Sequence, residues 1–217
     1  SQFDEDGIIR ECMNRIGGKT KLSKTLVEIG CGDGKENNSH QMMLDGWSAV
    51  WIDGSSAKIE SIKQELGGAV FPNLLLLHEM VDKTNVSHLT RDIKNFLGHE
   101  PIDFFSLDID GNDFHVCPSF VTALNPKLIC VEYNAKFPPP TDLVMGYNPS
   151  HIWKHDDYFG ASLQSWVNLS EKLGYTLVAC NLTGANAFFV DNVYADLFTR
   201  YSVESLYQPQ RYYLLGS

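Results

Sequence analysis

The feature that most constrains this chain is a regular alternation between short apolar runs and longer segments with helical periodicity. Five runs have the length of buried strands and are separated by helical segments; they span residues 25–29, 48–52, 74–77, 103–107 and 128–133. Such alternation is typical of repeated β–α units around a mainly parallel sheet. Two further runs, 176–180 and 187–190, are expected to pair in an antiparallel manner. The sequence therefore predicts a doubly wound α/β fold with seven strands, mainly parallel, and an antiparallel strand near the C-terminus.

The segments between the runs carry start and stop signals for helices. The expected helices span residues 4–16, 39–45, 86–97, 118–124 and 162–173. One more is expected to be capped by Ser55 or Ser56 and to end at Gly67-Gly68, while Gly17-Gly18 and Gly46 end the first two. A chain of 217 residues fits one domain, which we expect to span residues 1–217.

One long connection, residues 135–160, departs from this pattern. It contains three consecutive prolines and several aromatic and histidine side chains, without helical or strand periodicity. A long irregular connection inside a compact domain is usually a functional loop or a lid. We expect it to contact the substrate through His151, Trp153, His155 and Tyr158, whose rings could stack on a sugar.

Charge and cysteine content narrow the function classes. The net charge is −10 and no block of Lys or Arg occurs, so neither a nucleic acid nor a membrane surface is the expected partner. No run reaches the ~18 apolar residues of a membrane-spanning helix. The 5 cysteines are odd in number and form no CxxC pair, so we expect no disulfide framework and a reducing, cytoplasmic location. The oligomeric state stays open.

The first apolar run leads directly into a glycine-rich turn, residues 30–34. Such a turn between a strand and a helix lets the backbone approach a nucleoside cofactor closely. A dinucleotide fingerprint requires a third glycine where Lys35 stands, which argues against NAD(P). Glu28, two residues before the first glycine, suits a cofactor that carries cationic groups. The predicted cofactor-binding residues here are Glu28, Gly30, Gly32 and Asp33.

Two acidic residues after the next strands are candidates for binding a nucleoside. Asp53 ends the second run, 21 residues after Gly32. An acidic residue about 20 residues beyond such a turn can accept hydrogen bonds from the ribose hydroxyls. Asp82 follows the third run and is the candidate for holding the adenine amino group, although Glu79 lies in the same polar stretch.

These blocks resemble known methyltransferase motifs. Residues 28–34 look like motif I of class I S-adenosylmethionine-dependent methyltransferases, and residues 51–53 look like motif II. The blocks 33–38, 46–53, 106–113 and 131–134 occur in the order of the FkbM-like methyltransferases, and the likeness covers about residues 25–190. It implies a Rossmann-like sheet, S-adenosylmethionine as cofactor, and methylation of a hydroxyl on a sugar or natural product, hence a small-molecule or glycan acceptor. Asn38, Gly54, Ser55 and Asp108 complete the predicted cofactor-binding residues.

Polar side chains also follow the fourth and fifth runs, whose ends should lie side by side. Like charges this close need neutralisation, and oxygen ligands favour Mg²⁺, Mn²⁺ or Ca²⁺ over zinc. The pattern is similar to the metal-dependent macrocin-type O-methyltransferases, and this likeness implies Asp110, Glu132 and Asn134 as ligands. Asp108 shares a face with Asp110 by the strand period of two, so the two stay interchangeable. Without a metal, Asp108 would contact the methionine end of the cofactor.

The predicted general bases are His115 and Asp113, because both lie beside Asp110. Methyl transfer to a hydroxyl is a direct displacement, so the chain needs no enzyme nucleophile. Two other interpretations stay open. One is an NAD(P)-dependent oxidoreductase, and the other is an inactive methyltransferase fold that serves as a binding module.

Overall fold

The computed structural model describes residues 1–66, 71–154 and 156–211. Within them the chain forms a seven-stranded sheet in the order β3-β2-β1-β4-β5-β7-β6. The strands are β1 (Thr25–Ile29), β2 (Ser48–Asp53), β3 (Leu74–His78), β4 (Phe104–Leu107), β5 (Leu128–Glu132), β6 (Tyr175–Cys180) and β7 (Asn186–Asp191). Strands β1 to β5 are parallel, and β7 runs antiparallel to both β5 and β6. The predicted fold class is therefore confirmed.

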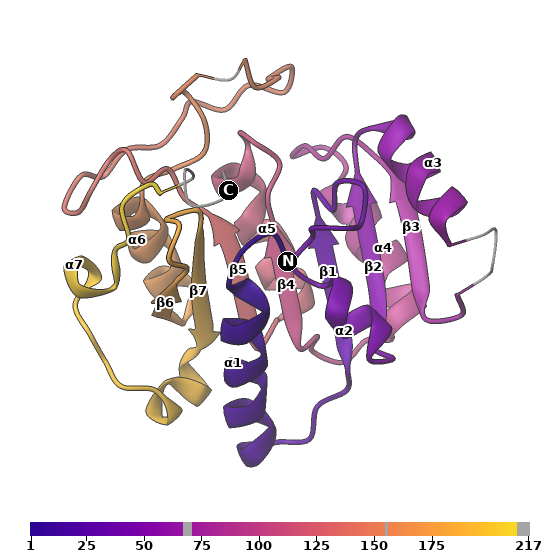
Figure 1. The fold of residues 1–217 in the computed structure, drawn as a ribbon, viewed down its shortest axis with the longest axis horizontal. Helices are drawn as coiled ribbons and strands as arrows, with labels where there is room; N and C mark the ends of the chain where they lie inside the picture. The colour runs from indigo at the N-terminus through magenta and orange to yellow at the C-terminus, as the bar shows by residue number, and fades with distance from the viewer. Residues whose placement is uncertain (67–70, 155, 212–217) are drawn as a thin grey trace.

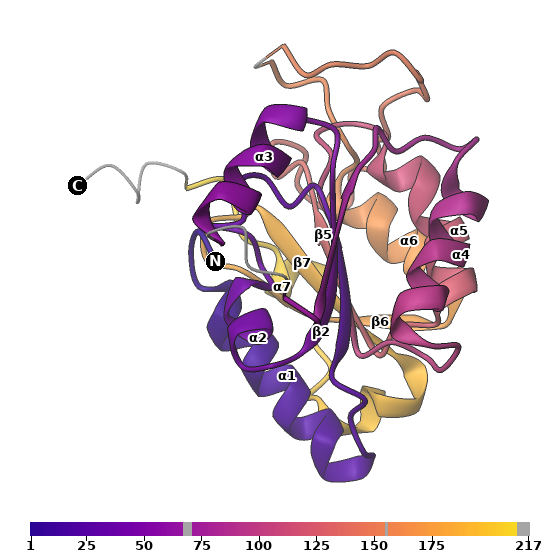
Figure 2. The same cartoon turned by 90° about the vertical axis from the view of Figure 1, so that its right-hand side faces the viewer.

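Helices cover both faces of the sheet, as Figure 2 shows. One layer holds α1, α2 and α3, and the other holds α4, α5 and α6. The helices are α1 (Glu5–Lys19), α2 (His40–Leu44), α3 (Ser56–Glu65), α4 (Val86–Leu97), α5 (Asp113–Leu124), α6 (Leu163–Leu173), the 3₁₀ helix η1 (Asn192–Leu197) and α7 (Val203–Leu206). No helix among the described residues is both long and apolar enough to cross a bilayer.

Two predicted helix boundaries are wrong. Helix α1 continues through Gly17 and Gly18 to Lys19, whose ammonium group binds Asp196 of η1. Helix α5 begins at Asp113 rather than near residue 118, and Pro118 lies inside it. A proline inside a helix removes one backbone hydrogen bond, but here the apolar face of α5 is buried in the core, and packing outweighs that loss. The predicted helix end at Gly67-Gly68 lies outside the described residues.

The strands at the centre of the sheet are buried on both sides because helices cover both faces. All five residues of β1 are buried, and consecutive side chains enter opposite cores. Val27 packs in the core beneath α4, α5 and α6, while Leu26 packs in the core beneath α1, α2 and α3. Polar side chains therefore gather where the strands end. The segment 135–160 rises beyond the carboxyl end of β5 at the top of Figure 1.

Candidate active site

The glycine-rich turn after β1 has a backbone that only glycine adopts easily. Gly30, Gly32 and Gly34 have φ of +84°, +61° and +78°, in the left-handed region. A Cβ atom on Gly30 would lie 1.5 Å from the carbonyl oxygen of Asp108. Because Gly30 lacks a side chain, the turn after β1 lies directly against the turn after β4.

The carboxylate of Glu28 organises the chain that follows this turn. It is 3% exposed and accepts hydrogen bonds from Asn37 Nδ2 (2.9 Å), Asn38 N (2.8 Å), Ser39 N (2.9 Å) and the Ser39 hydroxyl. Burial raises the pKa of Glu28 in spite of these donors. Both of its oxygens are thus bound by the chain itself. Glu28 shapes the loop before α2, and its predicted contact with the cationic groups of a cofactor stays a prediction.

Asn38 extends this network across the sheet. Its side-chain Nδ2 donates to Ser106 Oγ (3.1 Å) on β4 and lies 3.5 Å from Cys130 Sγ on β5. Asp33, by contrast, lies at the surface of the turn, where it accepts from Lys35 N (3.2 Å). Asn38 therefore ties the turn after β1 to the middle of the sheet, and Asp33 does not.

Asp53 lies at the end of β2, next to the glycine-rich turn. It is 7% exposed and accepts hydrogen bonds from Gly32 N (2.9 Å) and Ser55 N (2.8 Å). The Ser55 hydroxyl accepts from Lys58 N and caps α3, which decides between the two predicted caps. A Cβ on Gly54 would lie 2.1 Å from Met80 Sδ, so the exposed Met80 covers this turn.

Asp82 forms a small turn of its own after β3. Its carboxylate accepts from the hydroxyl and the backbone N of Thr84, each at 2.6 Å. The Thr84 hydroxyl, followed by its N–H, lowers the pKa of Asp82. Asp82 is therefore ionised near neutral pH and could still accept a hydrogen bond from an adenine amino group.

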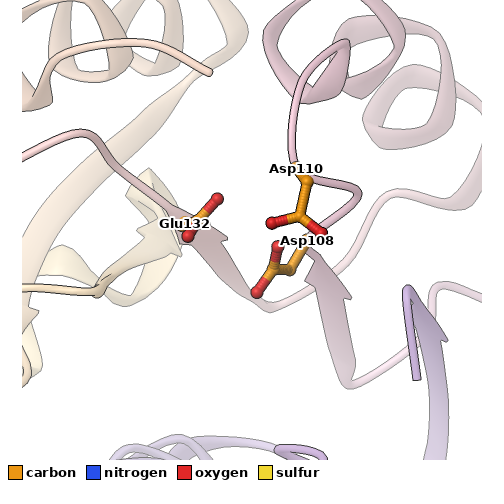
Figure 3. A group of neighbouring side chains, drawn as sticks. All are labelled: Asp108, Asp110 and Glu132. Atoms are coloured by element: carbon orange, nitrogen blue, oxygen red, sulfur yellow. The ribbon is translucent and has the colours of Figure 1, made fainter. Parts of the chain in front are cut away.

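Three carboxylates meet at the ends of β4 and β5. One oxygen from each of Asp108, Asp110 and Glu132 lies within 4.8 Å of the others, and Figure 3 shows Glu132 facing the two aspartates. Burial and then Asp110 raise the pKa of Asp108 well above its usual value. Burial and then Asp108 do the same for Glu132. In this acidic cluster, ionising Asp108 and Glu132 together is therefore unfavourable.

Asp113 shapes the turn that carries the cluster. It is 1% exposed and accepts from Ile109 N (2.7 Å) and Gly111 N (2.8 Å), so both of its oxygens are bound. Between these donors lies Asp110, whose φ of +57° is unusual for a residue with a side chain. Non-glycine residues in this conformation concentrate at functional sites, where the surrounding structure enforces the strain. Asp113 supplies that enforcement.

Two predicted site residues, Asn134 and His115, contact the 135–160 segment through their side chains. Asn134 is 1% exposed, and its Nδ2 donates to the carbonyl oxygens of Asp157 (2.9 Å) and Phe159 (3.3 Å) while its Oδ1 accepts from Lys136 N. Its amide thus braces the 135–160 segment. His115 Nε2 lies 2.7 Å from the carbonyl oxygen of Met145 and likewise holds this segment.

The 135–160 segment is attached to the turn after β4 by a reciprocal pair of bonds. Asn112 Nδ2 donates to Asn148 O (2.7 Å), and Asn148 N donates to Asn112 Oδ1 (3.1 Å). Nearby, His151 Nε2 lies 3.2 Å from Asp110 O. A Cβ on Gly111 would lie 2.3 Å from the His151 ring, so the imidazole packs directly against that glycine. Nothing in the sequence distinguished Asn112, since its partner is 36 residues away.

The remaining predicted substrate residues divide into two groups. Tyr158 is 59% exposed, makes an edge-on contact with His151, and accepts from Gly146 N through its hydroxyl. Trp153 donates to Asp156 O within its own loop and packs edge-on against Phe159. His151 and Tyr158 therefore lie beside the acidic cluster, whereas Trp153 folds onto the loop. His155 lies outside the described residues.

Comparisons with known proteins support the fold. No family model and no curated protein sequence matches the chain. Magnesium protoporphyrin IX methyltransferase (ChlM) from Synechocystis PCC 6803 with bound SAH superposes with a TM-score of 0.53 at 10% identity, over 86% of this chain and 81% of that chain. The methyltransferase domain of bacterial CtHen1-C gives 0.52 at 14% identity, over 88% and 97%. At these identities the likeness concerns the fold alone: the chain has the Rossmann-like fold seen in these methyltransferases.

Proposed function

We propose that this protein is an S-adenosylmethionine-dependent methyltransferase acting as one domain. The observation that carries the proposal is the joint between the turns after β1, β2 and β4. Gly30 lets the first turn lie against Asp108, and Asp53 binds the same turn through Gly32 N. The joint lies at the carboxyl ends of neighbouring parallel strands, where open α/β sheets bind ligands. Gly30 and Gly32 belong to the motif I resemblance, Asp53 belongs to the motif II resemblance, and Asp108 lies in the block 106–113.

The acceptor in this proposal is a hydroxyl on a sugar or a small natural product, as the FkbM-like blocks imply. The 135–160 segment is the acceptor loop, because His151 and Tyr158 lie beside the acidic cluster and Tyr158 is exposed. Exposed rings next to a polar cluster suit a ring-shaped acceptor that carries hydroxyl groups.

A divalent cation fits the acidic cluster. Glu132 Oε2 is buried and has no hydrogen-bond partner among the described residues, which a buried oxygen seldom tolerates. A set of carboxylate oxygens matches the preference of Mg²⁺ or Mn²⁺. We propose that Asp108, Asp110 and Glu132 hold this ion in place of the predicted set with Asn134. Once bound, it would lower the pKa of an acceptor hydroxyl and orient it.

The protein's own contribution to the reaction is alignment. The acceptor oxygen displaces the sulfonium sulfur from the methyl carbon, the sulfur keeps the electron pair, and the hydroxyl proton leaves. Holding the two reactants in line supplies about 7–11 kcal/mol, and a general base adds about 10²–10⁴-fold. His115 stays the predicted base, and it would have to exchange Met145 O for the acceptor hydroxyl. Asp113 acts as a positioning residue.

Calorimetric titration of S-adenosylmethionine and S-adenosylhomocysteine, with Mg²⁺ and then with EDTA, tests the proposal. We expect binding that weakens at least about tenfold in Asp53→Ala, because a buried carboxylate that accepts ribose hydroxyls is lost. Asp45→Ala removes a carboxylate at the surface end of α2 and serves as the control. NAD(P)H binding without S-adenosylmethionine binding would establish the oxidoreductase, and no binding at all would leave a binding module.

A further inference from the structure

One residue outside the predicted site lies directly opposite Glu132. In the antiparallel pair of β5 and β7, Glu132 is in register with Asn186. Directly opposed residues point to the same face of a sheet, with Cβ atoms about 4.5–5.5 Å apart. Cys130 and Phe188, two residues away on each strand, both pack in the core beneath α1, α2 and α3. The side chains of Glu132 and Asn186 therefore leave the sheet together on that face.

These two neighbours share an unusual property. Glu132 Oε2 and Asn186 Oδ1 are both buried oxygens without a hydrogen-bond partner among the described residues, and Asn186 is 8% exposed. A buried acceptor without a partner is destabilising, because it has lost its hydrogen bonds to water. Two such acceptors thus lie opposite each other on adjacent strands, beside the acidic cluster.

Glu5 determines which end of the Asn186 amide faces the cluster. Its carboxylate is 0% exposed and accepts from Asn186 Nδ2 (3.0 Å), Asn181 Nδ2 (2.7 Å) and Phe3 N (3.0 Å). A carboxylate only accepts hydrogen bonds, so the NH₂ group of Asn186 must face Glu5 and the carbonyl oxygen must face away. The start of α1 thereby orients an amide of β7.

We propose that the cation site of the acidic cluster extends to β7, with Asn186 Oδ1 as an additional ligand and Glu5 as its positioning residue. A neutral carbonyl adds an oxygen ligand without adding negative charge to the cluster. Asn186 thus fills the amide role that the sequence predicted for Asn134. The inference rests on the cation part of the proposed function and is independent of methyl transfer.

Mn²⁺ binding, measured by electron paramagnetic resonance of the full chain loaded with S-adenosylhomocysteine, tests the inference. In Asn186→Ala we expect the Kd for Mn²⁺ to rise about tenfold, as is usual when a partner of a metal site is removed. Asn134→Ala removes an equally buried amide and should leave the Kd unchanged. The double variant Glu5→Gln with Asn186→Asp exchanges donor and acceptor, so an oxygen again faces the cluster, and Mn²⁺ binding should return, tighter than in wild type because that oxygen belongs to a carboxylate.

The outcomes separate this inference from the proposed function. An unchanged Kd in Asn186→Ala overturns the inference, and so does wild-type protein that binds S-adenosylhomocysteine but no Mn²⁺, which leaves the methyltransferase intact. Protein that binds Mn²⁺ with the expected variant effects but no cofactor contradicts the proposed function alone. If thermal melting shows that Asn186→Ala does not fold, the double variant decides: Mn²⁺ binding tighter than in wild type, from the carboxylate now at residue 186, supports the ligand role, and an unchanged or higher Kd in the folded double variant overturns it.

Discussion

The two halves of the candidate site differ in how their charges are compensated. At the ends of β1 and β2, Glu28 and Asp53 accept hydrogen bonds from the chain itself, chiefly from backbone N–H groups. At the ends of β4, β5 and β7, carboxylates face one another and two buried oxygens have no partner among the described residues. The first half contains one buried oxygen without such a partner, Asn37 Oδ1, but both of its carboxylates accept hydrogen bonds from the chain, whereas in the second half the carboxylates of Asp108 and Glu132 lie close to each other. Removing one negative charge should therefore destabilise the folded protein when the charge lies in the first half, and stabilise it when the charge lies in the second half.

The largest effect is expected where the two halves touch. Gly30→Ala places a Cβ against Asp108 O in a backbone with φ of +84°, and should lower the free energy of unfolding by about 3 kcal/mol and abolish binding of S-adenosylmethionine. Gly18→Ala, in α1 with open space around it, should raise the free energy of unfolding by about 0.5–1 kcal/mol. Urea denaturation of both variants, with calorimetry, checks this. Equal stability of the two would contradict the close approach.

Neutralising Glu28, in the first half of the site, should destabilise the protein. In Glu28→Gln one acceptor oxygen becomes an NH₂ group, which faces the Asn38 N–H even when the remaining oxygen keeps the donors of Asn37 and Ser39, so we expect a loss of about 2 kcal/mol at pH 7. Denaturant unfolding measures it. An unchanged midpoint would mean that the loop before α2 does not depend on this carboxylate.

Neutralising Glu132, in the second half of the site, should change the free energy of unfolding in the opposite direction. The pKa of Glu132 is raised in the folded state, so protonated Glu132 favours folding. This contribution to the free energy of unfolding is fully present below the unfolded pKa and is lost as the pH rises through the folded pKa. Glu132→Gln removes that loss and should stabilise the protein by about 1 kcal/mol at pH 8, with no gain at pH 4. Thermal melting across this pH range provides the test. Mg²⁺ should stabilise the wild type at pH 8 and leave the variant unchanged, and a variant less stable than wild type at pH 8 would refute the comparison.

The smallest effect concerns the acceptor loop. Asn112→Ala removes both bonds to Asn148 and should cost about 1 kcal/mol locally, seen as faster amide exchange in residues 145–151 with little change in global stability. Asn73→Ala removes a similar amide-to-carbonyl bond to Trp47 and should leave that exchange unchanged. Exchange that rises equally in both variants would show that Asn112 does not hold the loop.

Local signals in the sequence were sufficient for much of the framework. Burial on both faces makes parallel strands continuously apolar, so the five runs, the two C-terminal strands and the sheet class followed from periodicity alone. The glycine turn was equally visible, because a positive φ leaves a mark in the residue type itself. The Ser55 cap depends on a bond to a residue three positions away. Each of these features is decided within a few neighbouring residues.

Only the tertiary structure decided which polar groups meet. Asn134 was predicted as a ligand from its place after a strand, yet its amide binds backbone carbonyls of the loop, and Asp113 is occupied by the turn it shapes. Asn186 stands opposite Glu132 because of the register between β5 and β7, and Glu5 reaches it from the other end of the chain. Spacing in sequence carries no information about such pairings, since register between distant strands is set by the packing of the whole sheet.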